Sequence, residues 1–474
     1  MIKYLLLAPA LLVGANAFAH QPDFDTHFVD RTMRVDLFHT GGPGTEVIAL
    51  DRILSDGPWP GNRTQLIDDT NLGKYLLEIV DPKTNRVLYS RGFATIYGEW
   101  ETTAESRTIN RTFHESLRFP WPRATAQVVL KKRDGMMGFS QLWAQLVDPD
   151  SRFVNPVDLK PVGKVWTLFE NGPPSQKVDL LLIGEGYTKE NMKKFRRDAR
   201  RLTDALFETE PFKSRKKDFN VRAIEVPSQS SGVSRPRAAD FNRTPVSLEY
   251  NIFDSERYLL TYDNRALRDV ASAAPYDFIE ILVNEEQYGG GGIFNFQATT
   301  SVDTAFAEYV FIHEFGHHFA ALADEYYTSP VSYKTGDVDV HPEPWEPNVT
   351  ALHDSAQLKW RELVAGDTPL PTNWPKEEFD EKSRAFQDRR AKLRAANAPE
   401  RELDTLFYEQ RDVLTELLGK QPYSDTVGAF EGASYEATGL YRPEMDCIMF
   451  TRDDVGFCRV CSAAIDRVID LYAH

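Results

Sequence analysis

Two different patterns of hydrophobic and polar residues divide the chain near residue 160. Before that point, short strand-like runs alternate with turn residues; the clearest runs span residues 32–38, 74–80, 86–96, 124–131 and 141–147. Runs of this length, separated by turns, are typical of antiparallel sheets. The pattern therefore predicts a small antiparallel β-sandwich over residues 20–160.

After two consecutive prolines at 173–174 the pattern changes to buried strands that alternate with helices. Continuous apolar runs, which indicate strands covered on both faces, lie at 178–183, 219–226 and 277–283. A basic stretch at 188–207 has the spacing of a helix capped by Thr188. We therefore expect an α/β (α+β) domain over residues 161–474.

A charged segment at residues 375–419 interrupts this second domain. It is dense in Glu, Lys, Arg and Ala and breaks at Asn397, Ala398 and Pro399. This composition predicts a solvated helical hairpin. A further hypothesis is that the hairpin shades a cleft and restricts large substrates.

The pentapeptide His313-Glu314-Phe315-Gly316-His317 is the strongest chemical signal in the chain. Residues at positions i and i+4 of a helix point the same way, so both imidazoles can reach one metal ion. The preceding residues 301–312 are compatible with a helix. His313 and His317 are therefore predicted zinc ligands, and Glu314 is the predicted general base.

Two histidines do not hold a catalytic zinc, so the sequence must supply a third ligand. If the helix continued beyond His317, Asp324 would lie about 10 Å further along its axis. The helix must therefore end near Ala320 for Asp324, our predicted third ligand, to return to the histidines. The alternatives are Glu325 and, farther along the chain, Glu343 or Glu346.

A second element lies far from the first, in residues 439–450. Its Cys447-Ile448-Met449 sequence resembles the Met-turn of metzincins, a tight turn that places a methionine beneath the metal ligands. Met449 is the predicted floor of the site. Taken alone, a methionine here would be an ordinary core residue.

Four blocks of sequence together resemble the bacterial IgA metallopeptidases, a metzincin-like family. They are VDLLLIGEGYT at 178–188, HEFGHHFAALADEY at 313–326, GAFEGASY at 428–435 and the segment 439–461. The resemblance implies a metzincin-like catalytic domain, one catalytic Zn²⁺ and Asp324 as third ligand. The chain departs from the pattern at Ala320, where a helix-ending glycine is expected.

The N-terminus indicates export. A lysine at position 3 precedes an apolar run at 4–13, and small residues allow cleavage after Ala17 or Ala19. Residues 1–19 are therefore a predicted signal peptide, and the mature protein is expected to be periplasmic or secreted. The apolar run is too short to span a membrane, and no later stretch qualifies.

All three cysteines, Cys447, Cys458 and Cys461, fall near the C-terminus. In an oxidising compartment we expect a disulfide that joins Cys447 to Cys458 or Cys461. A zinc site is the alternative, but it requires four ligands and the sequence offers only three cysteines in this region.

The glycines at 289–292 lead into residues 293–296, just before the metal helix. In metzincin-like folds an edge strand lies along the cleft here and can pair with an extended peptide. A loop beside one buried strand is an equal alternative. The formal net charge of −16 argues against a nucleic acid partner.

These observations predict an exported zinc endopeptidase that acts on protein or peptide substrates. The alternatives are an exported metal-containing binding protein and a zinc hydrolase of a non-peptide bond. Glu314 favours the enzyme, because a purely structural metal site needs no carboxylate there. Some metzincins carry a Tyr two residues after the Met, but this chain has Thr451. The remaining candidates to stabilise an oxyanion are Tyr435, Tyr441 and Arg442.

Overall fold

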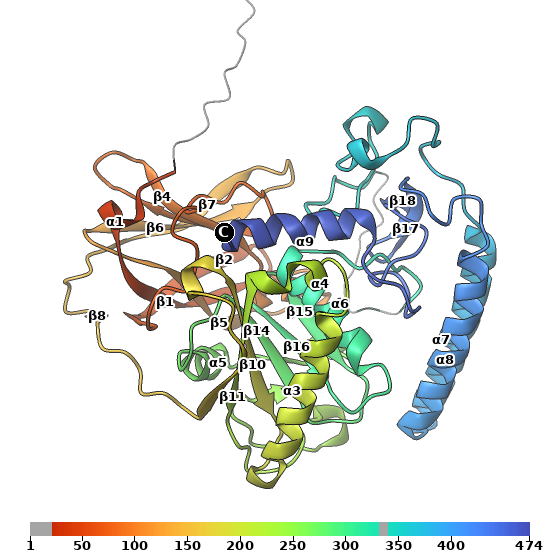
Figure 1. Cartoon of the computed structure of the whole chain (residues 1–474), viewed down its shortest axis with the longest axis horizontal. Helices are drawn as coiled ribbons and strands as arrows, with labels where there is room; N and C mark the ends of the chain where they lie inside the picture. The colour runs from red at the N-terminus through yellow and green to blue at the C-terminus, as the bar shows by residue number, and fades with distance from the viewer. Residues whose placement is uncertain (1–20, 330, 332–339) are drawn as a thin grey trace, which may run out of the picture.

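The computed structural model describes residues 21–329, 331 and 340–474. The predicted signal peptide at residues 1–19 therefore lies outside the described residues. Within the described part of the chain, no helix is both long and apolar enough to cross a membrane. Figure 1 shows the strand-rich N-terminal region beside a mixed α/β region.

The N-terminal region contains two four-stranded sheets. The first has the order β5-β1-β2-β8 and the second β4-β3-β6-β7, and every pairing is antiparallel except the short one between β2 and β8. The strands are β1 (Phe28–Gly42), β2 (Thr45–Ser55), β3 (Tyr75–Val80), β4 (Val87–Phe93), β5 (Arg111–Pro122), β6 (Ala126–Arg133), β7 (Phe139–Val147) and β8 (Val154–Asn155). The short helices α1 (Phe24–His27) and α2 (Ile96–Trp100) accompany them.

Alternating apolar residues from both sheets form one hydrophobic core. The shared residues include Val35, Leu37, Leu77, Ile79, Leu117, Phe119, Val128 and Leu130. Each strand contributes every second residue, because successive side chains of a strand point to opposite faces. Two sheets that enclose one core have the arrangement of a sandwich, as the alternating pattern predicted.

A six-stranded sheet with the order β15-β16-β14-β10-β11-β9 is the centre of the α/β region. Its strands are β9 (Lys164–Phe169), β10 (Val178–Glu185), β11 (Phe219–Glu225), β14 (Phe278–Val283), β15 (Gly290–Ile293) and β16 (Gln297–Ser301). The four inner strands are parallel, whereas the edge strands β9 and β15 are antiparallel to their neighbours.

Both faces of this sheet are covered, which explains the continuous apolar runs of its inner strands. Leu180 and Leu182 of β10 pack in one core with residues of the helices α3 (Met192–Leu206) and α6 (Ala307–Ala320). Leu181 and Ile183 pack on the opposite face with residues of α5 (Asn264–Ala271). The predicted inner strands and the basic helix are thereby confirmed as elements, but α3 begins at Met192 and Thr188 makes no capping hydrogen bond with its side chain.

Helix α6, which carries His313 and His317, begins at Ala307. This is six residues later than residue 301, where the helix-compatible sequence begins. Gln297–Ser301 forms strand β16, which pairs with β14 on one side and β15 on the other. Of the residues with helical spacing, Ser301 is therefore the last residue of a strand, and residues 302–306 form bends and turns before the helix.

The charged segment forms two helices, α7 (Lys376–Ala395) and α8 (Glu400–Leu418), as predicted for residues 375–419. Leu403 and Phe407 of α8 pack against Tyr288 and Phe306, so one face of the hairpin rests beside the start of α6. The remaining elements are α4 (Phe212–Arg215), β12 (Leu248–Glu249), β13 (Leu260–Thr261), β17 (Phe430–Ala433), β18 (Glu436–Arg442) and α9 (Arg459–Tyr472).

Candidate metal centre

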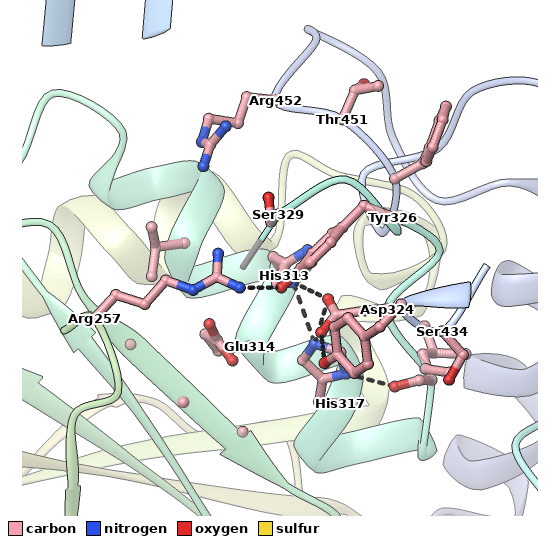
Figure 2. Close-up of a pocket in the computed structure, with 18 of the residues that line it drawn as sticks. Arg257, His313, Glu314, His317, Asp324, Tyr326, Ser329, Ser434, Thr451 and Arg452 are labelled. Atoms are coloured by element: carbon pink, nitrogen blue, oxygen red, sulfur yellow. Dashed lines mark hydrogen bonds and ion pairs between the residues drawn. The ribbon is translucent and has the colours of Figure 1, made fainter. Parts of the chain in front are cut away.

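Helix α6 presents His313 and His317 one turn apart, with their rings toward one cavity (Figure 2). His313 Nδ1 donates a hydrogen bond to the carbonyl oxygen of Ile448 at 2.9 Å. His317 Nδ1 donates to the carbonyl oxygen of Leu322. Because both protons are held at Nδ1, each histidine is left with an Nε2 lone pair for a metal.

The chain reverses directly after the helix, as the position of Asp324 requires. Helix α6 ends at Ala320, and Ala321 adopts the left-handed conformation with φ of 56°. An L-residue with a Cβ pays about 1 kcal/mol or more for this conformation. The turn that the family pattern assigns to a glycine at 320 is thus made here by an alanine, one residue later.

Asp324 returns to the two histidines. Its Oδ1 lies 3.0 Å from His313 Nε2 and 3.2 Å from His317 Nε2, and the two Nε2 atoms are 3.1 Å apart. Adjacent ligand atoms of a tetrahedral zinc site, with bonds of about 2.0–2.2 Å, lie roughly 3.3 Å from each other. The triangle therefore has nearly the size that a zinc ion needs.

Three acceptor atoms this close repel each other unless a cation or a proton lies between them. Burial lowers the pKa of His317, but the Asp324 carboxylate outweighs burial and raises that pKa to about 9. Burial also opposes ionisation of Asp324, yet His317 and His313 hold its pKa well below the usual range. The electrostatics and the donor set of the triangle fit a bound divalent cation.

Of the alternative third ligands, Glu346 lines the cavity but is not grouped with the two histidines, and Glu325 and Glu343 make other contacts. Glu325 is fully buried and points away from the histidines, toward Asn348 and Cys461. Glu343 accepts hydrogen bonds from Thr350 and from the backbone of Ala351. Among the described residues that can bind a metal, Asp324 is the one grouped with His313 and His317.

Glu314 lies on the cavity wall beside strand β15 (Figure 2). Burial raises the pKa of its carboxyl, and the neighbouring charges of His313 and His317 oppose that rise. A carboxylate whose pKa is raised toward the working pH accepts and returns a proton more readily than an exposed one. This environment suits the predicted role of general base.

Met449 lies beneath the metal helix. Its Sδ would be 3.1 Å from a Cβ at Gly316, so the glycine between the two histidines makes room for the methionine. Residues 447–451 form a tight turn, because the amides of Phe450 and Thr451 both bond the Cys447 carbonyl. The position matches the predicted floor of the site.

The cavity in front of the histidines has a volume of about 390 Å³. Edge strand β15 forms one wall, and its glycines pack closely on α6. A Cβ at Gly292 would overlap the backbone carbonyl of Glu314 and lie 2.9 Å from the Cβ of His317. An edge strand therefore lies beside α6, but the glycines at 290–292 with Ile293 form it, and residues 294–296, where the strand was expected, form a turn. Gly290 also exchanges backbone hydrogen bonds with Arg257 and Leu259.

Several cavity residues were not found from the sequence. Arg257 donates to the Tyr326 hydroxyl at 2.7 Å, and Arg452 also lines the cavity (Figure 2). The Tyr435 hydroxyl contacts Asp324 Oδ2, which keeps this oxyanion candidate near the site. Two cations in a partly enclosed site can stabilise developing negative charge.

The other two oxyanion candidates lie away from the cavity lining. Arg442 is fully buried, with its guanidinium stacked 3.8 Å from the Phe450 ring centroid. Tyr441 pairs with Thr350 through its backbone. Neither residue lines the cavity, whereas Thr451, two residues after Met449, does.

Both the sandwich and the helical hairpin contribute to the cavity walls. From the N-terminal region come Lys74, Ala94, Gly98, Glu99 and Thr102. From the hairpin come Phe379, Ser383, Gln387, Gln410, Arg411 and Leu414. The hairpin and the sandwich thus both border the cleft, and restriction of large substrates by the hairpin stays a hypothesis.

The expected disulfide is not formed. All three cysteines are free, and Cys447 Sγ lies 3.9 Å from Cys461 Sγ. A disulfide bond is about 2.05 Å long. Cys458 and Glu325 join the two other thiols in one buried group, so the pairing prediction is replaced by a four-residue cluster.

Comparison with known protein families agrees with this geometry. A family model described as IgA Peptidase M64 matches residues 166–469, and one described as Peptidase M64 N-terminus matches residues 23–144. These matches place the chain among the metallopeptidases. The first match spans more than half of the 474 residues, so the chain belongs to the IgA peptidase M64 family. A search of curated proteins found no match.

The ligand assignment predicts a clear difference between two adjacent acidic residues. Asp324→Ala and His313→Ala should each lose the histidine-coordinated metal, because two remaining ligands cannot hold the ion tightly. Glu325→Ala should retain it, since this side chain faces away. X-ray absorption of the zinc-loaded proteins measures imidazole scattering. Loss of that signal in Glu325→Ala but not in Asp324→Ala would reverse the assignment.

The close approach of β15 to α6 predicts a cost for any side chain at residue 292. Gly292→Ala should lower the free energy of unfolding by about 1–3 kcal/mol, because its Cβ meets backbone that must shift. Urea unfolding measures the change. Gly366→Ala is the matched control, because a Cβ there has no neighbour within 4 Å. Equal stability of the two variants would contradict this packing.

Proposed function

We propose that the protein is an exported, zinc-dependent endopeptidase that hydrolyses peptide bonds in protein substrates. The single observation that carries the proposal is the triangle of His313 Nε2, His317 Nε2 and Asp324 Oδ1, 3.0–3.2 Å on each side. The triangle borders an open cavity, so a fourth ligand position faces the substrate side. Catalytic zinc sites keep such an open position, whereas structural sites close it.

Zinc bound to these three residues would lower the pKa of a water molecule towards 7 and polarise the scissile carbonyl. Glu314, which directly follows His313 and lies three residues before His317, would take the proton from the attacking water and then give it to the leaving amine. The carbonyl oxygens of Ile448 and Leu322 hold the two imidazoles in the orientation that ligation requires.

The cavity shape supports an extended peptide as substrate. Its volume of about 390 Å³ accommodates a few side chains rather than a folded surface. Edge strand β15 runs along one wall, and an extended segment adds to such an edge by main-chain hydrogen bonds. The segment 257–259 covers this edge at Gly290, so pairing is proposed for the part of β15 nearer the histidines.

The family membership favours this enzyme over the alternatives. A binding protein with a structural metal needs neither the open ligand position nor Glu314. A zinc hydrolase of a non-peptide bond would use the same metal centre, but membership of a peptidase family supports peptide hydrolysis. Mapping of new N-termini in a protein mixture treated with the enzyme identifies substrates and cleavage sites.

Export is proposed from the signal peptide predicted at residues 1–19. Expression of the full chain in a Gram-negative host should yield periplasmic or secreted protein that begins at residue 18 or 20. A variant without residues 2–19 is the control and should remain in the cytoplasm. N-terminal sequencing of the fractionated protein decides the question, and an uncleaved full-length product in the cytoplasm would contradict export.

The proposed mechanism predicts that replacement of the general base Glu314 abolishes most activity but leaves the metal bound. Glu314→Gln keeps the volume of the side chain but cannot accept the proton, so proteolysis should fall by about 10²–10⁴-fold or more. Imidazole-bound zinc should be unchanged. Met449→Leu, which alters only the packing beneath α6, should cost much less. The assay uses a substrate found by cleavage-site mapping, with chelator-treated enzyme as the blank; full activity of Glu314→Gln would refute the mechanism.

A further inference from the structure

A second group of possible metal ligands lies behind the candidate active site. It consists of Cys447, Cys458, Cys461 and Glu325, whose ligand atoms all lie within 4.8 Å of one another. The four side chains are buried, with exposed fractions between 0% and 5%. They come from three separate parts of the chain: the segment after α6, the turn before Met449 and the start of α9.

The spacing of the group has the size of a tetrahedral zinc site. With Zn–S bonds of about 2.3 Å, two sulfur ligands lie roughly 3.8 Å apart, and a sulfur and an oxygen ligand roughly 3.5 Å. The distance from Cys447 Sγ to Cys461 Sγ is 3.9 Å, and Cys461 Sγ lies 3.3 Å from Glu325 Oε1. Both distances agree with zinc ligation and are too long for covalent bonds.

Glu325 supplies an independent observation that points to a cation. Its carboxyl is fully buried, and Oε2 has no hydrogen-bond partner among the described residues. Asn348 Nδ2 donates to Oε1 at 2.9 Å, which orients the carboxyl toward the cysteines. A buried carboxylate with an unsatisfied oxygen is costly, and a metal ion at the centre of the group would satisfy it.

Backbone amides around the sulfurs favour thiolates. The amides of Met449 and Cys458 donate to Cys447 Sγ at 3.5 and 3.3 Å, and the amide of Cys461 donates to Cys458 Sγ at 3.3 Å. Cys458 is also the N-cap of α9, whose dipole stabilises negative charge in its first turn. Such amide contacts orient metal ligands and fix their charge.

A third group of possible metal ligands lies in the N-terminal region, and it differs from the cysteine cluster because arginines neutralise its carboxylates. Asp36, Asp51 and His114 also lie close together, but Arg52 binds Asp36 at 2.7 Å and Arg265 binds Asp51. Arginine charges already neutralise those carboxylates, so the group needs no metal.

We infer that Cys447, Cys458, Cys461 and Glu325 form a second zinc site, closed to solvent and structural in role. Three thiols bind as thiolates and release their protons on ligation. With four protein ligands, the site has no open position for substrate. The inference does not depend on peptidase activity, because it requires only the geometry of these four residues.

This zinc would hold the two segments that build the candidate active site. Glu325 directly follows Asp324, and its amide donates to the Met449 carbonyl at 2.8 Å. Cys447 directly precedes Ile448, whose carbonyl orients His313. Ligation of Glu325 and Cys447 to one ion therefore fixes the third ligand and the Met-turn relative to each other, and α9 anchors both.

The unmodified mature protein gives the first test. We expect two zinc ions per chain by elemental analysis and a zinc–sulfur shell at about 2.3 Å in X-ray absorption. Denaturation in chelator without reductant should expose three titratable thiols. One thiol would reveal a disulfide and overturn the inference, as would three thiols with zinc bound to nitrogen and oxygen alone.

Variants then separate the two sites. His313→Ala should keep the sulfur-bound zinc, whereas Cys461→Ser should lose one zinc per chain together with the zinc–sulfur shell. Glu325→Gln should weaken binding at the same site while Asn348 can still bond the amide oxygen. Ser462→Ala, the neighbouring position in α9, is the matched control and should keep both ions.

Cobalt substitution keeps the test independent of whether a cysteine variant folds. Cobalt(II) added to metal-free wild-type protein should give an intense near-ultraviolet thiolate-to-cobalt charge-transfer band, which the His313, His317 and Asp324 site cannot produce. His313→Ala should retain this band. Its absence from wild-type protein that has bound two cobalt ions would overturn the assignment of the cysteines as ligands.

Discussion

The reversal of the chain after α6 is the constraint on which the candidate active site depends. Ala321 turns the backbone through the left-handed region, and residues 323–326 then continue without regular secondary structure. The contacts of two adjacent side chains point to opposite sides of this segment: Asp324 contacts the histidines and Glu325 contacts Cys461. A shift of one residue would exchange the two side chains and destroy both groups.

Backbone hydrogen bonds on both sides fix the register of this short segment. The Met449 carbonyl accepts from the amide of Glu325, and the carbonyl of Asp324 accepts from the amide of Ser434. Asn348 bonds both the amide and the carbonyl of Ala323. These contacts compensate for the conformational cost at Ala321, because the tertiary structure leaves the segment no other position.

The features that local sequence determines were predictable. The spacing of His313 and His317 follows from helix geometry, and the family resemblance supported Asp324 and Met449. The inner strands β10, β11 and β14 were also visible as apolar runs, whereas the inner strand β16 and the edge strand β9 were not predicted. Nor was the start of α6 predicted, because Ser301 pairs with Val283 in the sheet, and residues 302–306 form bends and turns despite the helical spacing of their apolar residues.

Features that depend on contacts between distant residues were beyond the sequence pattern. No spacing rule connects Glu325 with Cys447, so the cysteines suggested a disulfide although the fold adds a fourth possible ligand. The sequence pattern also did not place Lys74 and Glu99 in the cavity wall. They reach it because the sandwich packs beside β15, where the amide of Ala94 bonds the Phe294 carbonyl at 2.9 Å. Packing decides which surface of each region faces the cleft.

The candidate metal centre opens to the cavity, whereas the cysteine group behind it is buried. This difference affects how the ligands of the metal centre are held in place. An open metal site has only three protein ligands, so a substrate that binds at the fourth position can pull the ion and distort the triangle. The side chains of His313 and His317 are fixed by carbonyls of Ile448 and Leu322, but Asp324 lies on a segment without regular secondary structure. The amide of Glu325 bonds the Met449 carbonyl, and its carboxyl lies in the buried cysteine group, so contacts on the side away from the histidines help to hold Asp324 in position.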